Sequence, residues 1–120
     1  MAKILVVDDS PAEMVRFREI LGKHGFELIE AFNGEEGYDK ACEQQPDLIL
    51  MDIVMPEMNG FQATRKITRD EKTAHIPVVI VSTKDQETDR VWGKRQGAKE
   101  YLVKPITEEQ LIGVIRSVLG

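Results

Sequence analysis

Five short apolar runs alternate with five amphipathic segments along this chain of 120 residues. The first, third and fourth runs are rich in Val, Ile and Leu without polar alternation, which is typical of strands covered on both faces. The second run carries two glutamates, so we expect it at an edge of the sheet. Strict alternation predicts right-handed crossovers and a doubly wound α/β domain with one parallel sheet and helices on both faces. The runs are Lys3–Asp8, Phe26–Ala31, Asp47–Asp52, Pro77–Ser82 and Glu100–Lys104.

Helix-start signals follow four of these runs. Ser10 precedes Pro11, and Glu13 stands three residues after Ser10, which is the pattern of a capping box with proline at the first helical position. Similar signals predict three further helix starts, at Asn33–Glu36, Thr83–Gln86 and Thr107–Gln110.

Apolar residues at helical spacing predict which helix faces are buried. The first helix is expected to bury four side chains, Met14, Phe17, Ile20 and Leu21. The third, from about residue 60 to 69, is expected to bury Phe61, Ala63 or Thr64, and Ile67. The fifth is expected to bury Leu111, Ile115, Val118 and Leu119. We expect Cys42 to face the core as a small apolar side chain, and residues 68–75 to form a solvated loop.

The segment between Gln86 and Gly97 offers only Val91 and Trp92 as large apolar side chains. Adjacent residues lie about 100° apart around a helix, so both cannot point into the core. The sequence therefore predicts a weakly anchored fourth helix with Trp92 at least partly exposed. Tryptophan is enriched at protein–protein contacts, which makes Trp92 a candidate partner contact.

The bulk composition limits the classes of protein to consider. A chain with 42% hydrophobic and 31% charged residues predicts one globular domain spanning residues 1–120, with no room for an output domain. The net charge of −5 and the absence of a basic stripe argue against nucleic-acid binding. The single cysteine excludes an internal disulfide. Without a signal pattern or a membrane-length apolar run, we expect a cytoplasmic protein that does not insert into membranes.

Charged and polar residues stand where the predicted strands end. Asp8 and Asp9 follow the first, Asp52 ends the third, Ser82 ends the fourth and Lys104 ends the fifth. In an open α/β sheet, ligands bind beyond the carboxyl ends of the strands. Three clustered carboxylates repel one another unless a cation joins them, and Mg²⁺ prefers oxygen ligands of this kind. The sequence therefore predicts a site for Mg²⁺ or Mn²⁺ and phosphate chemistry at an aspartate.

Each of these residues can be given a chemical role. Asp52 is the candidate anionic nucleophile for a phosphoryl group. Lys104 and the Ser82 hydroxyl can share the charge on the phosphoryl oxygens. The Lys104–Pro105 bond is a candidate cis peptide. The candidate metal ligands are Asp8, Asp9, Asp52 and the backbone carbonyl of Val54.

Taken in order, five motifs resemble those of CheY-type receiver domains of two-component response regulators, over essentially all 120 residues. They are Val6–Ser10, Met51–Pro56, Asn59–Gly60, Val81–Thr83 and Lys104–Pro105. The resemblance implies a flavodoxin-like fold with strand order 2-1-3-4-5. It also implies Mg²⁺-dependent transfer of a phosphoryl group to Asp52 from a phosphohistidine on a partner histidine kinase.

The same resemblance implies how the signal leaves the site. Ser82 and Tyr101 occupy switch positions, and Tyr101 would turn inward after phosphorylation. The face formed by the fourth helix, fifth strand and fifth helix, with Trp92 and Tyr101 on it, would then change protein partners. Residues 53–65 and 83–98 further resemble regulators of twitching motility driven by type IV pili. The expected partners are therefore a chemotaxis-like histidine kinase and a protein that controls pilus motors.

Three other functions remain open from the residues alone. An aspartate-dependent phosphatase would need a second carboxylate two residues after the nucleophile, where Val54 stands. A flavodoxin-like cofactor binder would need a phosphate-binding loop, but Asp8 and Asp9 would repel a phosphate. The chain could also be an interaction module that works without phosphorylation. We expect a monomeric signalling protein rather than an enzyme, acting by binding a target or as a phosphate sink for a shared kinase.

Overall fold

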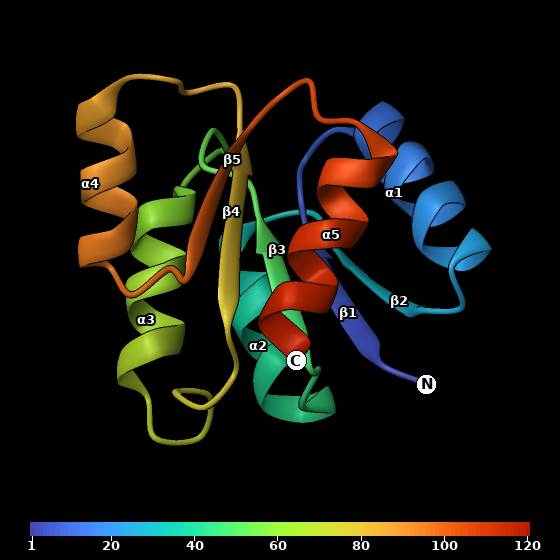
Figure 1. Cartoon of the computed structure of the whole chain (residues 1–120). Coiled ribbons are helices and arrows are strands. Elements are labelled where there is room, and N and C mark those ends of the chain that lie inside the picture. The colour runs from blue at the N-terminus through green and yellow to red at the C-terminus, as the bar shows by residue number, and fades with distance from the viewer.

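The computed structural model of the chain describes all residues from 1 to 120. Five parallel strands form one sheet in the order β2-β1-β3-β4-β5, as the resemblance implies, and β2 lies at an edge as its glutamates predict. Figure 1 shows this sheet at the centre of the molecule with helices on both of its faces. The elements in chain order are β1 (Lys3–Val7), α1 (Pro11–Lys23), β2 (Glu27–Ala31), α2 (Gly34–Gln44), β3 (Leu48–Met51), α3 (Gly60–Arg69), β4 (Val78–Ser82), α4 (Glu87–Arg95), β5 (Glu100–Val103) and α5 (Glu108–Leu119).

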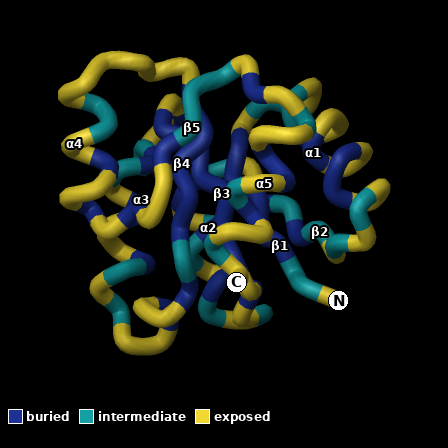
Figure 2. Tube along the Cα trace, in the orientation of Figure 1, coloured by how far each residue is buried: buried dark blue, intermediate teal, exposed yellow.

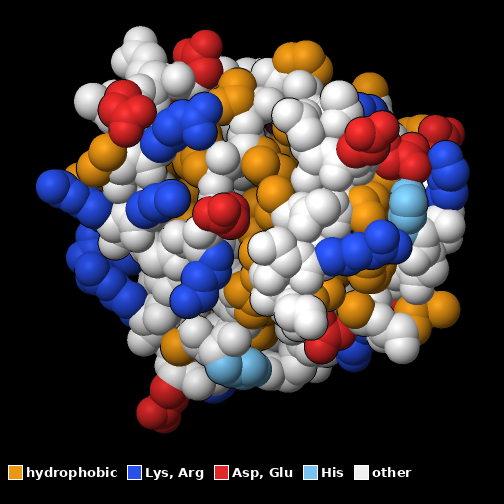
Figure 3. All heavy atoms as spheres, viewed as in Figure 1, with side chains coloured by type: hydrophobic (Ala, Val, Ile, Leu, Met, Phe, Trp, Pro, Cys, Tyr) orange, Lys and Arg blue, Asp and Glu red, His pale blue; other side chains and the backbone are white.

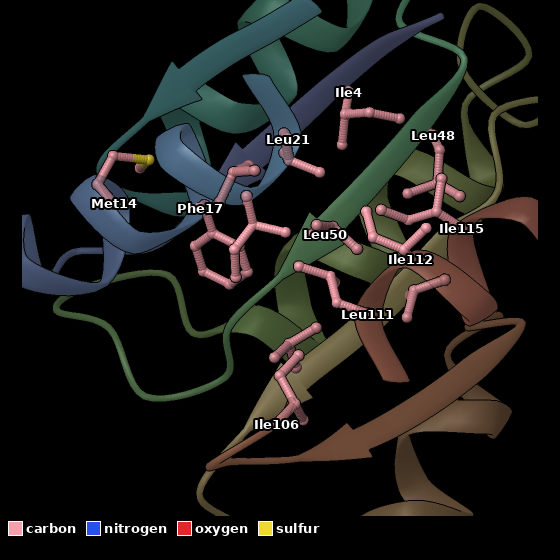
Figure 4. Close-up of a cluster of buried hydrophobic side chains, with 14 residues drawn as sticks. Ile4, Met14, Phe17, Leu21, Leu48, Leu50, Ile106, Leu111, Ile112 and Ile115 are labelled. Carbon is pink, nitrogen blue, oxygen red and sulfur yellow. The ribbon is translucent and has the colours of Figure 1, made fainter. Parts of the chain in front are cut away.

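Alternate residues of the central strands point into two separate cores. In β1, Ile4 and Val6 pack against α1 and α5, whereas Leu5 and Val7 pack against α2 and α3. Figure 4 shows side chains of the first core, and Figure 2 shows that the strands are buried while many loop residues are exposed. Burial on both faces explains why the strand sequences are continuously apolar. No helix combines the length and the apolar character that crossing a membrane requires.

The buried helix faces match the sequence predictions in α1 and differ in part in α3 and α5. All four predicted α1 residues are buried, and in α3 Ala63, Thr64 and Ile67 are buried while Phe61 is only partly covered. In α5 the prediction for Leu119 is wrong, because this last helical residue is exposed. Ile112, which was not predicted, is buried instead.

Two predictions about loops and surface positions are also wrong. Residues 68–75 are not a simple solvated loop, because α3 continues to Arg69 and Thr73 is fully buried. The Thr73 hydroxyl donates a hydrogen bond to the Ile67 carbonyl at 2.6 Å, which holds the segment against the helix end. Cys42 does not lie in the core but is partly exposed on α2.

Two of the predicted helix caps differ in the structure. The cap of α4 is Gln86 rather than Thr83, and the Gln86 N–H donates to the Asp89 carboxylate at 3.1 Å. In α1 the Ser10 hydroxyl accepts from the Glu13 N–H at 3.2 Å, as predicted. The Glu13 side chain, however, does not return to the Ser10 N–H, because Asp8 already accepts from that donor at 2.9 Å.

The predicted exposure of Trp92 on α4 is confirmed. Trp92 is 49% exposed and Val91 is exposed beside it, so neither side chain anchors the helix. The helix instead packs through Gly93, where an added Cβ would lie only 2.8 Å from Ile80 Cδ1. A helix held to the sheet mainly by a glycine has few apolar contacts to lose when it moves.

Candidate functional site

The strand register brings the three candidate carboxylates together beyond the ends of β1 and β3. The Asp52 N–H donates to the Val7 carbonyl at 2.9 Å, which extends the ladder and sets Asp52 beside the residues that follow β1. One carboxylate oxygen from each of Asp8, Asp9 and Asp52 lies within 4.8 Å of the others. Asp8 and Asp52 are buried and Asp9 is exposed. The structure therefore assembles the acidic cluster that the strand ends predict.

Lys104 supplies the cation on the other side of this cluster. The Lys104 N–H donates to the Ser82 carbonyl at 2.8 Å, and the Lys104–Pro105 peptide is cis. The Lys104 Nζ lies 2.8 Å from Asp8 Oδ2 and 3.7 Å from Asp52 Oδ2. The side chain is only 10% exposed, so water screens these charges weakly. Lys104 therefore already compensates part of the negative charge of the site.

Sequence reasoning missed one member of the cluster, Glu13 on α1. Its Oε1 lies 3.1 Å from the Lys104 Nζ, closer than the Asp52 oxygen. The sequence indicates only a helix cap for Glu13, because nothing in the local sequence links residue 13 to residue 104. The signal that could have found it is an acidic residue one helical turn after the carboxylates of the first strand end.

Burial and neighbouring charges shift the acid–base equilibria of the site. Burial raises the pKa of the Asp52 carboxyl, and the negative charge of Asp8 adds to this effect. The Lys104 ammonium and the Ile53 N–H, which donates to Asp52 Oδ1 at 2.8 Å, oppose it only in part. Burial alone would lower the pKa of Lys104, but its contacts with Asp8 and Asp52 outweigh burial and raise it. Lys104 therefore stays charged. Ionised Asp52, in contrast, lowers the stability of the folded protein.

We expect Asp52→Asn to raise the melting temperature of the metal-free protein at neutral pH. Because the pKa of Asp52 is raised on folding, stability falls as the pH rises from the ordinary carboxyl pKa through the folded value. The gain should therefore shrink as the pH is lowered toward the ordinary value. Melting curves in chelator from about pH 4 to about pH 8 measure it. Asp39→Asn, at an exposed position on α2, should show no such gain, and a lower melting temperature for Asp52→Asn at neutral pH would contradict the account.

Gly60 fixes the backbone on which Asp52 stands. Asn59 caps α3 and the Gly60 N–H donates to the Ile53 carbonyl at 2.9 Å. A Cβ at position 60 would lie 2.0 Å from the Asp52 carbonyl oxygen, closer than any two such atoms can approach. The close contact of α3 with the strand end therefore requires glycine. In the sequence, Asn59–Gly60 is one of the motifs that carry the resemblance, and it does not predict this contact.

Ser82 and Tyr101 both form hydrogen bonds with the backbone of Lys84, in the loop that follows β4. Ser82 is fully buried, and its hydroxyl oxygen accepts from the Lys84 N–H at 3.3 Å. The Tyr101 ring is buried against Gly93 and Ile80, and its hydroxyl donates to the Lys84 carbonyl at 2.7 Å. The inward ring that the resemblance assigns to the phosphorylated state is thus the arrangement observed.

Tyr101 consequently offers little surface of its own to a partner. It lines one wall of a hollow of about 300 Å³ between α4 and β5 that Arg90, Val91 and Lys94 also line. Figure 3 shows basic side chains over this part of the molecule, at the left of the view. A partner would meet Val91, Trp92 and these cations before it met the tyrosine.

Val54 follows the acidic cluster on an exposed loop. Its side chain borders a shallow hollow of about 300 Å³ shared with Lys84 and Asp89. The proposed ligand at this position is the backbone carbonyl rather than the side chain, so it places no demand on residue type.

The donor set suits a hard divalent cation. Asp8, Asp9 and Asp52 offer only oxygen atoms, two of the three carboxylates are buried, and a single ammonium balances them. Mg²⁺ in proteins is commonly held by one or two carboxylates together with waters and phosphate oxygens. The residues therefore fit a Mg²⁺ ion that also binds waters and a phosphoryl oxygen.

This chain is a member of the response regulator receiver domain family, whose sequence model matches residues 4–116. It is 58% identical over 120 residues to the protein PilH of Pseudomonas aeruginosa, covering 100% of this chain and 99% of PilH. It is 37% identical over 117 residues to the polar-differentiation response regulator DivK of Brucella anthropi, covering 98% and 95% of the two chains. The resemblance to receiver domains, and within them to pilus regulators, is thereby confirmed.

Solved structures confirm the fold. The chemotaxis protein CheY4 of Vibrio cholerae superposes with a TM-score of 0.92 at 31% identity, covering 98% of each chain. The receiver domain of the sensor histidine kinase PA1611 of Pseudomonas aeruginosa superposes with a TM-score of 0.92 at 27% identity, covering 99% of this chain and 98% of that domain. The latter structure holds a magnesium ion coordinated in its active site cleft.

Proposed function

We propose that this receiver accepts a phosphoryl group at Asp52 from a phosphohistidine on a partner histidine kinase, in a reaction that requires Mg²⁺. The observation that carries the proposal is the convergence of Asp8, Asp9, Asp52 and Lys104 at one edge of the sheet. The magnesium ion in the cleft of the PA1611 receiver domain supports the choice of cofactor. The domain spans residues 1–120, and the cytoplasmic location and monomeric state expected from the sequence belong to the same proposal.

Each side chain of the site has a separate role in the transfer. Asp52 Oδ2, which faces Lys104, is the nucleophile, since Oδ1 accepts the Ile53 N–H. The Lys104 ammonium and the Ser82 hydroxyl balance charge on the phosphoryl oxygens. Asp8, Asp9, Asp52 and the Val54 carbonyl would hold Mg²⁺, which when bound neutralises the anions that must approach one another. The products are an acyl phosphate on Asp52 and a neutral histidine on the kinase.

Output passes from Ser82 to the face of α4, β5 and α5. The Ser82 hydroxyl oxygen accepts a hydrogen bond from the Lys84 N–H. A phosphoryl group on Asp52 would draw this hydroxyl toward the phosphate and away from Lys84. The Tyr101 hydroxyl donates a hydrogen bond to the Lys84 carbonyl, so both switch residues are bonded to the same loop residue. The new charge would then bias a two-state equilibrium of this loop and α4.

The likeness to PilH supports a role in the control of type IV pilus twitching motility. The partners would be a chemotaxis-like kinase and a protein that acts on the pilus motors. The protein would be a phosphoacceptor that catalyses only its own phosphorylation and dephosphorylation. A phosphate sink for a shared kinase is an alternative output of the same phosphorylation. An interaction module independent of phosphorylation is the alternative to the proposal itself.

Mixing the protein with a phosphorylated histidine kinase tests the proposal. Labelled phosphate should move to the wild-type chain when Mg²⁺ is present and stay on the kinase in chelator. An Asp52→Asn variant should take up none. Transfer that is indifferent to Mg²⁺, or equal in the variant, would contradict the proposal.

We expect Trp92→Ala to weaken binding of the downstream partner by more than about tenfold, as the loss of a central aromatic contact does. Phosphoryl uptake at Asp52 should be unchanged, because Trp92 is half exposed on α4 and belongs to none of the hydrophobic core clusters. Partner pull-down and label uptake measure the two effects separately. Val15→Ala, at an exposed apolar residue of α1, is the control that should change neither. A Trp92→Ala protein that no longer takes up phosphate would show that the residue is structural.

A further inference from the structure

Lys104 has one more carboxylate partner than the proposed transfer needs. Its ammonium lies within hydrogen-bonding distance of Asp8 Oδ2, at 2.8 Å, and of Glu13 Oε1, at 3.1 Å. The Asp52 oxygen is farther away, at 3.7 Å, so it is attracted by charge without a direct hydrogen bond. In this arrangement the Lys104 ammonium forms a closer ion pair with Glu13 than with the acceptor, Asp52.

The capping of α1 explains why Glu13 is free to reach Lys104. In α3 and α5 the side chain at the same helical position, Gln62 or Gln110, accepts the N–H of its own cap residue at 2.9 Å. In α1 that donor, the Ser10 N–H, is taken by Asp8 Oδ1 at 2.9 Å. Asp8 therefore binds the cap with one oxygen and Lys104 with the other, and Glu13 is released to reach across to the lysine.

The surroundings leave room for the lysine to move. Glu13, Thr83, Lys104 and Pro105 line an open hollow of about 330 Å³ beside the site. Arg16, the nearest cation on α1, donates to the Ile106 carbonyl instead of neutralising Glu13. Arg16 lines the same hollow, but Lys104 is the side chain that forms the ion pair with Glu13.

We propose that Glu13 is a positioning residue that holds the Lys104 ammonium on the α1 side of the site and so slows phosphoryl uptake at Asp52. This inference rests on the proposed function. Without Glu13 the ammonium would have one fewer anion to bind, and it could approach Asp52 and the phosphoryl oxygens more closely.

The first measurement concerns the contact itself in the metal-free protein. Nitrogen-15 NMR of the Lys104 ammonium should show a shifted and faster-exchanging signal in Glu13→Gln than in wild type. Glu13→Asp should show the same change, because the side chain is one methylene shorter and loses the contact while keeping the charge. Glu19→Gln is the matched control, since Glu19 is an exposed residue of α1 that makes no ion pair, and it should leave the signal unchanged.

The second measurement is the initial rate of label uptake from acetyl phosphate with Mg²⁺. We expect Glu13→Gln and Glu13→Asp to be faster than wild type by roughly three- to tenfold, with Glu19→Gln unchanged. Wild-type rates in Glu13→Gln, or an unmoved Lys104 signal, would overturn this inference alone. Acceleration in Glu13→Gln but not in Glu13→Asp would also overturn it, because charge and not position would be responsible. A wild-type protein that takes up no label would overturn the proposed function and this inference with it.

Discussion

Replacing Gly60 with alanine is expected to destabilise the fold by about 3 kcal/mol and to abolish phosphoryl uptake at Asp52. The added Cβ would meet the Asp52 carbonyl oxygen at 2.0 Å and the Ile53 Cα at 2.7 Å. Both contacts are with backbone, so no side chain can rotate away. Either α3 or the end of β3 must shift, and Asp52 would move with it.

Thermal unfolding and label uptake measure the two effects. A loss of about 3 kcal/mol corresponds to a melting temperature roughly 10 °C lower for a domain of this size. The matched control is Gly113→Ala in α5, where an added Cβ meets nothing within 4 Å. That change should be neutral or stabilise the helix by up to about 1 kcal/mol. If Gly60→Ala melted like the control and still took up label, the contact between α3 and Asp52 would not be as described.

Replacing Lys104 with methionine is expected to slow phosphoryl uptake by about 100-fold. The long apolar side chain keeps most of the volume of the lysine but removes the charge that balances the phosphoryl oxygens. Asp8 and Asp52 would then face each other without their ammonium. A bound divalent cation should consequently raise the melting temperature more in this variant than in wild type.

Lys99→Met is the control for Lys104→Met. Lys99 is exposed, lies just before β5 at the opposite end of the strand from Lys104, and makes no ion pair. Its replacement should change neither the rate of label uptake nor the response of the melting temperature to Mg²⁺. If the two variants behaved alike, Lys104 would have no special part in the reaction.

The parts of the site that could be predicted are those set by the topology of the sheet. Residues that end parallel strands must lie at one edge, so Asp8, Asp52 and Lys104 could be brought together from their places in the chain. The same reasoning predicts the edge position of β2, and the spacing of apolar residues predicts the buried face of α1. These features depend on periodicity, which a sequence shows directly.

The parts that could not be predicted depend on competition between polar groups or on close packing. The direction of Glu13 depends on whether Asp8 or Glu13 accepts the Ser10 N–H, and both carry the required carboxylate. The start of α4 at Gln86 rather than Thr83 depends on which of several polar residues caps it. The inward ring of Tyr101 depends on the space beside Gly93, which only the packed structure reveals.

The most direct test of the central claim is to identify the residue that carries the phosphoryl group. Protein incubated with acetyl phosphate and Mg²⁺ can be treated with borohydride, which reduces an acyl phosphate to an alcohol and so converts the modified aspartate to homoserine. Peptide mass spectrometry then locates the change. The account predicts homoserine at position 52 alone, and only when Mg²⁺ was present. Homoserine at another aspartate, or none at any position with abundant Mg²⁺ and donor, would contradict it.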